Sequence, residues 1–160
     1  MSSRLIQSIV LALIASALLC ASASAETDYS KSIGGYSVYL GVVPAEIVRG
    51  HTAVHTEATM HGGAKTTGDS HHVMVSIMDE KTGKQVANAT VEGRVGEIGL
   101  SVTGKKLEPM VIAGTTTYGN FFSMSGTGPF QIDVEFRLSG QAQPQSTRFY
   151  YTHPSFNPPR

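Results

Sequence analysis

The chain has 160 residues, with 12 Lys and Arg against 12 Asp and Glu, so its formal net charge at pH 7 is zero. This balance argues against a nucleic-acid partner, because phosphate binding needs clustered positive charge. The single cysteine, Cys20, lies in the N-terminal apolar run described next. The rest of the chain can therefore form no disulfide and offers no thiolate metal ligand.

Residues 1–25 have the features of a secretory signal peptide. Arg4 precedes the apolar run Leu5–Leu19, which is short for a membrane span, and the small residues Ala23–Ala25 suit a signal peptidase. A lipid anchor on Cys20 is the weaker alternative, because a leucine precedes this cysteine where lipoprotein signals have a small residue. We expect export to the periplasm and a mature chain that begins at Glu26. That chain has no second apolar stretch able to cross a bilayer, so we expect no membrane insertion.

Residues 26–151 show the period-two alternation of half-buried β-strands, and no run looks helical for more than a turn or two. The clearest strand is Phe130–Leu138, whose apolar residues Ile132, Val134 and Phe136 face one way and whose charged residues face the other. The other expected strands are Tyr36–Val43, Thr52–Met60, His71–Met78, Ala89–Val95, Tyr118–Met124 and Ser146–Tyr151, with turn signals at Asp79–Gln85, Ser125–Pro129 and Ser139–Gln145.

About seven to eight short strands at close spacing predict an all-β fold, an immunoglobulin-like antiparallel β-sandwich. We find no internal repeat and no linker, so residues 26–151 are expected to form one domain. The proline-rich residues 152–160 are expected to be a flexible C-terminal tail.

Side chains that can bind a metal ion gather between residues 51 and 61, in the sequence HTAVHTEATMH. If this segment is the strand expected above, His55 and Glu57 lie on one face, with Cα atoms about 6.5–7 Å apart. Their imidazole and carboxylate groups can then meet at one ion, and His51 and His61 lie at the two ends of the segment. A solvated strand face with a chance cluster of these residues is the alternative, and the sequence leaves it open.

A second group of candidates falls in the expected strand His71–Met78. The aliphatic side chains of this strand form its core face, which leaves His72, Met74 and Met78 on the opposite face. Methionine on a strand more often packs than binds a metal, so packing is the favoured interpretation for Met74 and Met78 individually.

Met110, which follows a proline, adds a soft thioether ligand to this set. Thioether sulfur selects copper, particularly cuprous copper, whereas imidazole suits copper, zinc and iron alike. Structural zinc sites are usually built with thiolates. A cysteine-free set of methionine, histidine and carboxylate therefore favours copper or ferrous iron.

Three stretches of the sequence resemble one family, the copper-dependent periplasmic ferrous-iron transport proteins of bacteria. HTEATMH resembles that family's HLEADIH-type strand. LEPMVIAGTTTYGNFFSM is similar to its block of a methionine, a short spacer and HYG…M, with Met110, Tyr118–Gly119 and Met124 in the same order. VEFRLSG falls where the family has a long alternating strand. The resemblance extends from Tyr36 to Tyr151.

The resemblance implies an immunoglobulin-like fold, often a homodimer, that binds copper through His, Met and His and serves iron acquisition beside an inner-membrane iron permease. His55 and Met110 match copper ligands of the family, and Glu57 matches a carboxylate beside the site. Two departures stand out: Thr117 replaces the histidine before YG, and Ser139–Ser146 replaces a histidine-rich loop. The histidines available as substitutes are His51, His61 and His72.

The sequence therefore predicts an exported metal-binding protein for copper, ferrous iron or both, acting in metal uptake or delivery. The alternative is a non-enzymatic envelope accessory whose metal site is degenerate. An enzyme is not expected. A copper–zinc superoxide dismutase would need a His-x-His pair and a disulfide, and the chain contains no G-x-S-x-G elbow, P-loop or dinucleotide fingerprint.

Overall fold

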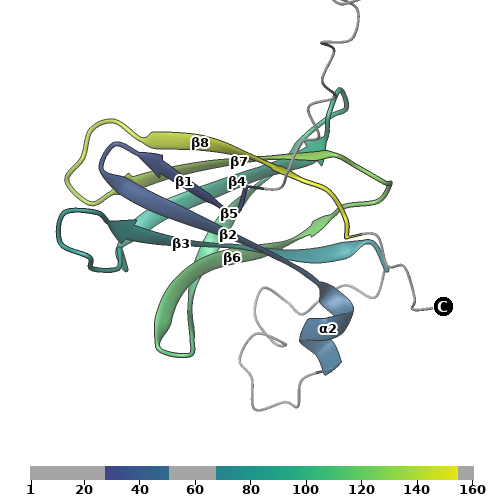
Figure 1. Cartoon of the computed structure of the whole chain (residues 1–160), viewed down its shortest axis with the longest axis horizontal. Coiled ribbons are helices and arrows are strands. Elements are labelled where there is room, and N and C mark those ends of the chain that lie inside the picture. Colours follow the sequence, from purple (N-terminus) through teal and green to yellow (C-terminus); the bar gives the residue numbers. More distant parts are fainter. Residues whose placement is uncertain (1–27, 51–67, 155–160) are drawn as a thin grey trace, which may run out of the picture.

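The computed structural model describes residues 28–50 and 68–154, which form eight strands and one short helix (Figure 1). The elements are β1 Ser30–Ile33, β2 Tyr36–Pro44, α2 Ala45–Gly50, β3 Ser70–Asp79, β4 Ala89–Glu97, β5 Thr103–Ile112, β6 Thr115–Ser123, β7 Phe130–Leu138 and β8 Gln145–Tyr151. The predicted all-β, sandwich-like fold is confirmed. The expected strand Thr52–Met60 lies outside the described residues.

The strands follow the order β1-β2-β3-β6-β5-β4-β7-β8, and every neighbouring pair is antiparallel. Strand β5 belongs to two layers: its first part, Thr103–Leu107, pairs with β4, and its second part, Glu108–Ile112, pairs with β6. A strand that changes partners in this way lets one continuous sheet fold over into two facing layers. Met110 is thereby placed in the layer of β2, β3 and β6.

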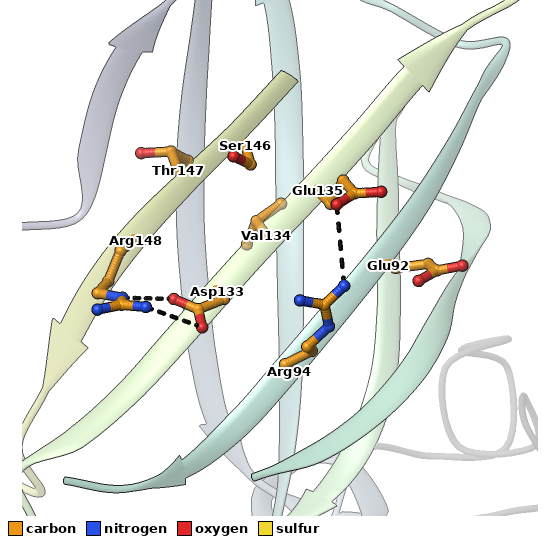
Figure 2. A pocket seen from close by; sticks show the side chains of 8 residues that line it. All are labelled: Glu92, Arg94, Asp133, Val134, Glu135, Ser146, Thr147 and Arg148. Atoms are coloured by element: carbon orange, nitrogen blue, oxygen red, sulfur yellow. Dashed lines mark hydrogen bonds and ion pairs between the residues drawn. The ribbon is translucent and has the colours of Figure 1, made fainter. Parts of the chain in front are cut away.

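Strand β7 has the alternation expected from its sequence. Its charged side chains Asp133 and Glu135 point to the outer face, where Figure 2 shows them beside arginines of the two neighbouring strands. Ile132, Val134 and Phe136 are at most 1% exposed, which confirms the predicted core face.

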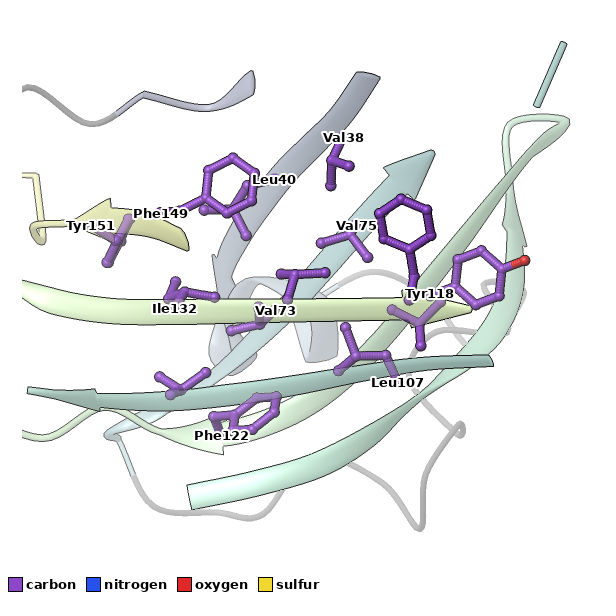
Figure 3. Packing of buried hydrophobic residues seen from close by; sticks show 14 of the residues in the cluster. Val38, Leu40, Val73, Val75, Leu107, Tyr118, Phe122, Ile132, Phe149 and Tyr151 are labelled. Carbon is purple, nitrogen blue, oxygen red and sulfur yellow. The ribbon is translucent and has the colours of Figure 1, made fainter. Parts of the chain in front are cut away.

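The main core fills the space between the two layers (Figure 3). It contains aliphatic and aromatic side chains from both layers, among them Val38, Leu40, Val73, Val75, Leu107, Tyr118, Phe122, Ile132, Phe149 and Tyr151. Neither His72 nor Met110 belongs to this cluster, although both are buried. They lie on the outer face of their layer.

The sequence did not predict β1, β5 or α2. Strand β5 reads TGKKLEPMVI and has no regular alternation, because its two parts face different surroundings and Pro109 interrupts it. The helix α2 follows β2 directly and contacts both β2 and β3. Within the described ranges, no helix is long and apolar enough to cross a lipid bilayer.

Candidate metal centre

The outer face of the β2-β3-β6-β5 layer carries the metal candidates that the structure describes. Met74 on β3 lies directly opposite Gly119 on β6, and Met110 on β5 lies directly opposite Thr117 on β6. Residues directly opposite each other on paired strands point to the same side of a sheet. His72, two residues before Met74, shares that side. The register thus brings together candidates that are far apart in the sequence.

His72 is fully buried on this face. Its ring stacks on the ring of Phe121, with centroids 4.6 Å apart and planes inclined by 27°. Phe121 packs in turn against Ala45 at the start of α2 and against Val43, in a small cluster separate from the main core. The stacking restricts the orientation of the imidazole plane.

Gly119 marks the point where the candidate ligands meet. A Cβ atom at Gly119 would lie 2.8 Å from Nε2 of His72, 2.8 Å from Cε of Met110 and 3.2 Å from Cγ of Met74. The φ angle of Gly119 is not in the left-handed region, so the backbone does not require glycine there. A glycine inside a strand weakens it and often marks a close approach. Here the missing side chain leaves the space in which one imidazole and two methionine side chains converge.

Met74 lies between two glycines. Gly41 on β2 and Gly119 on β6 are its direct partners on either side. A Cβ at Gly41 would lie 3.3 Å from Cε of Met74, whereas Cγ is the atom near Gly119. Since the sulfur is bonded to both Cγ and Cε, it lies between the two glycine positions.

A hollow of about 280 Å³ borders this group on the same face. Met74 and Thr117 line it beside the cluster, and Tyr39 and Ile112 are among its other lining residues. Oγ1 of Thr117 is buried and has no hydrogen-bond partner among the described residues. The hollow reaches the protein surface at Tyr39, which is about half exposed.

The other predicted site residues, His51, His55, Glu57 and His61, lie outside the described residues, so their convergence with Met110 stays a prediction. In residues 28–50 and 68–154, no three His, Cys, Asp or Glu side chains gather closely enough to hold a metal ion. The side chains that this part of the chain brings together at Gly119 are one histidine and two methionines.

The sequence favours packing for Met74, and it presents Gly119 only as part of a motif. The signal for Gly119 was an isolated glycine in a run of strand-forming residues, YGNFF. Its three neighbours come from β3 and β5, so their identity could not be deduced from β6 alone.

A pair of histidines, His71 and His153, lies at the start of β3. His71 is buried, and its ring centroid is 4.7 Å from that of His153, whose ring also contacts Phe130 and Tyr151. Nδ1 of His71 is 3.2 Å from the carbonyl oxygen of Asp69. Burial lowers the pKa of His71, against the opposing effect of that hydrogen bond, so the ring is neutral at pH 7.

The other layer carries a larger hollow, of about 360 Å³, lined by β4, β7 and β8 (Figure 2). Four of its five charged residues form two ion pairs: Nε of Arg148 is 2.6 Å from Oδ1 of Asp133, and Nη2 of Arg94 is 3.8 Å from Oε2 of Glu135. These are exposed ion pairs of a solvated sheet face, which contribute little stability. The metal candidates Met74 and Met110 lie on the opposite layer, beside the smaller hollow of about 280 Å³.

No protein-family model matches this sequence, and no curated protein matches it significantly. Solved structures with the same fold include a DUF4426 family protein from Pseudomonas aeruginosa PAO1, with a TM-score of 0.60 and 15% identity, covering 79% of this chain and 93% of that one. A copper-bound variant of FetP from uropathogenic Escherichia coli strain F11 has a TM-score of 0.58 and 11% identity, covering 77% and 92%. The copper-reconstituted P19 protein of Campylobacter jejuni has a TM-score of 0.58 and 11% identity, covering 77% and 91%. At these identities the likeness shows the fold.

Proposed function

We propose that this chain is an exported periplasmic metal-binding protein that takes up or delivers copper, ferrous iron or both beside an inner-membrane permease. In this proposal the protein is not an enzyme. The observation that carries the proposal is the convergence of His72 Nε2 and the Met110 side chain on one point beside Gly119.

The residues at this point suit copper. Imidazole nitrogen and thioether sulfur are both copper ligands, and the thioether favours the cuprous ion. Both side chains lie against Gly119, and Thr117 adds a buried oxygen that has no hydrogen-bond partner among the described residues. The copper-bound structures of FetP and P19, which share the fold, support the same chemistry.

The resemblance seen in the sequence adds His55 and Glu57 to the proposed ligands, with His51 and His61 as further imidazoles. Glu57 is the group that would accommodate ferrous iron, since sets of two histidines and one carboxylate are characteristic of non-haem iron. A homodimer and an iron permease are the partners that the resemblance implies.

Thr117 makes the proposed site weaker than one with a histidine at that position. A site with an open position exchanges its ion more readily than a closed structural site. Exchange suits a protein that passes its ion on. We therefore expect moderate affinity and fast release.

One observation favours a second candidate, an envelope accessory protein with a degenerate metal site. Thr117 and the loop Ser139–Ser146 lack the histidines that the resembled family has there. In that case the sandwich serves as an interaction module and the cluster at Gly119 is packing.

Elemental analysis of protein purified from the periplasm, followed by titration with copper(I) and copper(II), separates the two candidates. Stoichiometric copper or iron, or saturable binding by the metal-free protein, supports the metal-binding function. His55→Ala should then weaken binding of both copper ions. If the protein is isolated without metal and binds neither copper ion, the metal-binding function is excluded and the accessory function is supported.

A further inference from the structure

Resting on the proposed function, we propose that Met74 is a third ligand and that His72, Met74 and Met110 form a site selective for the cuprous ion. Among the described residues, the proposed ligands are one imidazole and two thioethers, whose side chains meet beside Gly119. The site lies within the part of the chain that the structure describes.

The geometry assigns Met74 this role through its neighbours. Met74 occupies the same row of the sheet as Gly41 and Gly119, its partners on β2 and β6. Any larger residue at Gly119 would separate Met74 from His72 and Met110, because its Cβ would lie within 3.2 Å of all three side chains. The Met74 side chain therefore lies against both glycines of its row.

The chemistry of the set determines which ion it prefers. Imidazole and thioether are neutral ligands, and two of the three donors are soft sulfur atoms. Soft thioethers select copper(I), whereas carboxylate, carbonyl and water oxygens suit magnesium, calcium and manganese. The two thioethers thus favour copper(I) over copper(II).

Met74 also borders the hollow on this face. Met74 and Thr117 line the hollow, whereas His72 is fully buried and does not line it. Of the three proposed ligands, Met74 is therefore the one that borders the hollow.

The test compares Met74→Leu with Met78→Leu in the full exported protein. Met78 lies on the same strand and the same side but opposite Ser37, away from Gly119. Methionine to leucine nearly conserves volume, so both variants should keep the melting temperature of the parent. Copper(I) affinity is measured anaerobically by competition with a chromophoric copper(I) chelator, and X-ray absorption of the copper(I) form counts the sulfur ligands.

We expect Met74→Leu to weaken copper(I) binding by about tenfold or more and to leave copper(II) binding almost unchanged. Sulfur scattering should fall from two ligands to one in Met74→Leu and stay at two in Met78→Leu. Equal copper(I) affinity in both variants, with a single sulfur in the parent, would show that Met74 only packs, while the proposed function would stand. Failure of the parent itself to bind copper(I) or copper(II) would instead overturn the proposed function.

Discussion

Met110 on β5 and Thr117 on β6 lie directly opposite each other on the outer face of their layer. Met110 is 3% exposed, and the buried hydroxyl oxygen of Thr117 has no hydrogen-bond partner in the described part of the chain. The threonine stands where the resembled family has a histidine. Position 117 lies opposite a buried methionine, so a histidine introduced there would add an imidazole next to Met110.

Thr117→His should tighten copper binding, because it adds an imidazole opposite Met110. We expect the gain to be larger for copper(II), about tenfold, since imidazole binds it better than thioether does. Copper(II) titration with electron paramagnetic resonance measures the change and shows whether a nitrogen ligand has been added. Thr116→His is the control, because Thr116 is the neighbour on the other side of the strand and lies opposite Val111. Equal behaviour of the two variants would contradict a site at Thr117.

Met110→Leu removes the sulfur and nearly conserves the volume, so it should weaken copper(I) more than copper(II) with little effect on the melting temperature. Parallel titrations of the two oxidation states measure the difference. Met124→Leu is the matched control, since Met124 is equally buried but belongs to the main core. A loss of copper(I) binding in the control as large as in Met110→Leu would mean that the loss comes from the fold and not from the sulfur.

Gly119→Ala changes none of the proposed ligand residues, but it adds a methyl group where their side chains meet. Its Cβ would lie 2.8 Å from both His72 Nε2 and Met110 Cε, so at least one of these side chains must move. We expect copper(I) affinity to fall by about tenfold or more and the melting temperature to decrease through overpacking.

The control for this change is Gly104→Ala on β5, where the added Cβ would have an ordinary contact of 3.5 Å with Cγ of Arg94. It should bind copper like the parent. Full copper affinity in Gly119→Ala would show that the space beside this glycine holds no ion.

Val134→Asp should unfold the domain. Val134 is 1% exposed in the centre of β7, and burying an unpaired carboxylate costs several kcal/mol against a total stability of roughly 5–15 kcal/mol. Circular dichroism during a thermal melt measures the effect. Glu135→Gln, at the next position but on the outer face, removes only an exposed ion pair with Arg94 and should melt like the parent. A cooperative melt of Val134→Asp at the parent temperature would refute the assignment of β7 to the core.

The exported protein should begin at Glu26, because Ala23–Ala25 suits a signal peptidase better than the residues before Cys20 suit lipid attachment. These residues lie outside the described ranges. Intact-mass spectrometry of periplasmic protein decides between the two forms. A mass that includes a diacylglyceryl group on Cys20 would show an anchored protein.

The strands of this protein could be predicted from the sequence because alternation of side chains is a local property. Phe130–Leu138 was predicted with the bounds that β7 has, and the core faces of β3 and β7 were assigned correctly, since burial on one face of a strand imposes a period of two. Strand β5 was missed for a related reason. Its two parts face different layers, so no single period describes it.

The candidate site depended on contacts that no local pattern contains. The sequence named His72 and Met110 separately as metal candidates, and it favoured packing for Met74. Their meeting at Gly119 follows from the register of β3 on β6 and from the change of layer within β5. Both are set by packing between segments far apart in the chain. Whether a strand glycine such as Gly119 adjoins other side chains depends on the tertiary structure, which the local sequence does not contain.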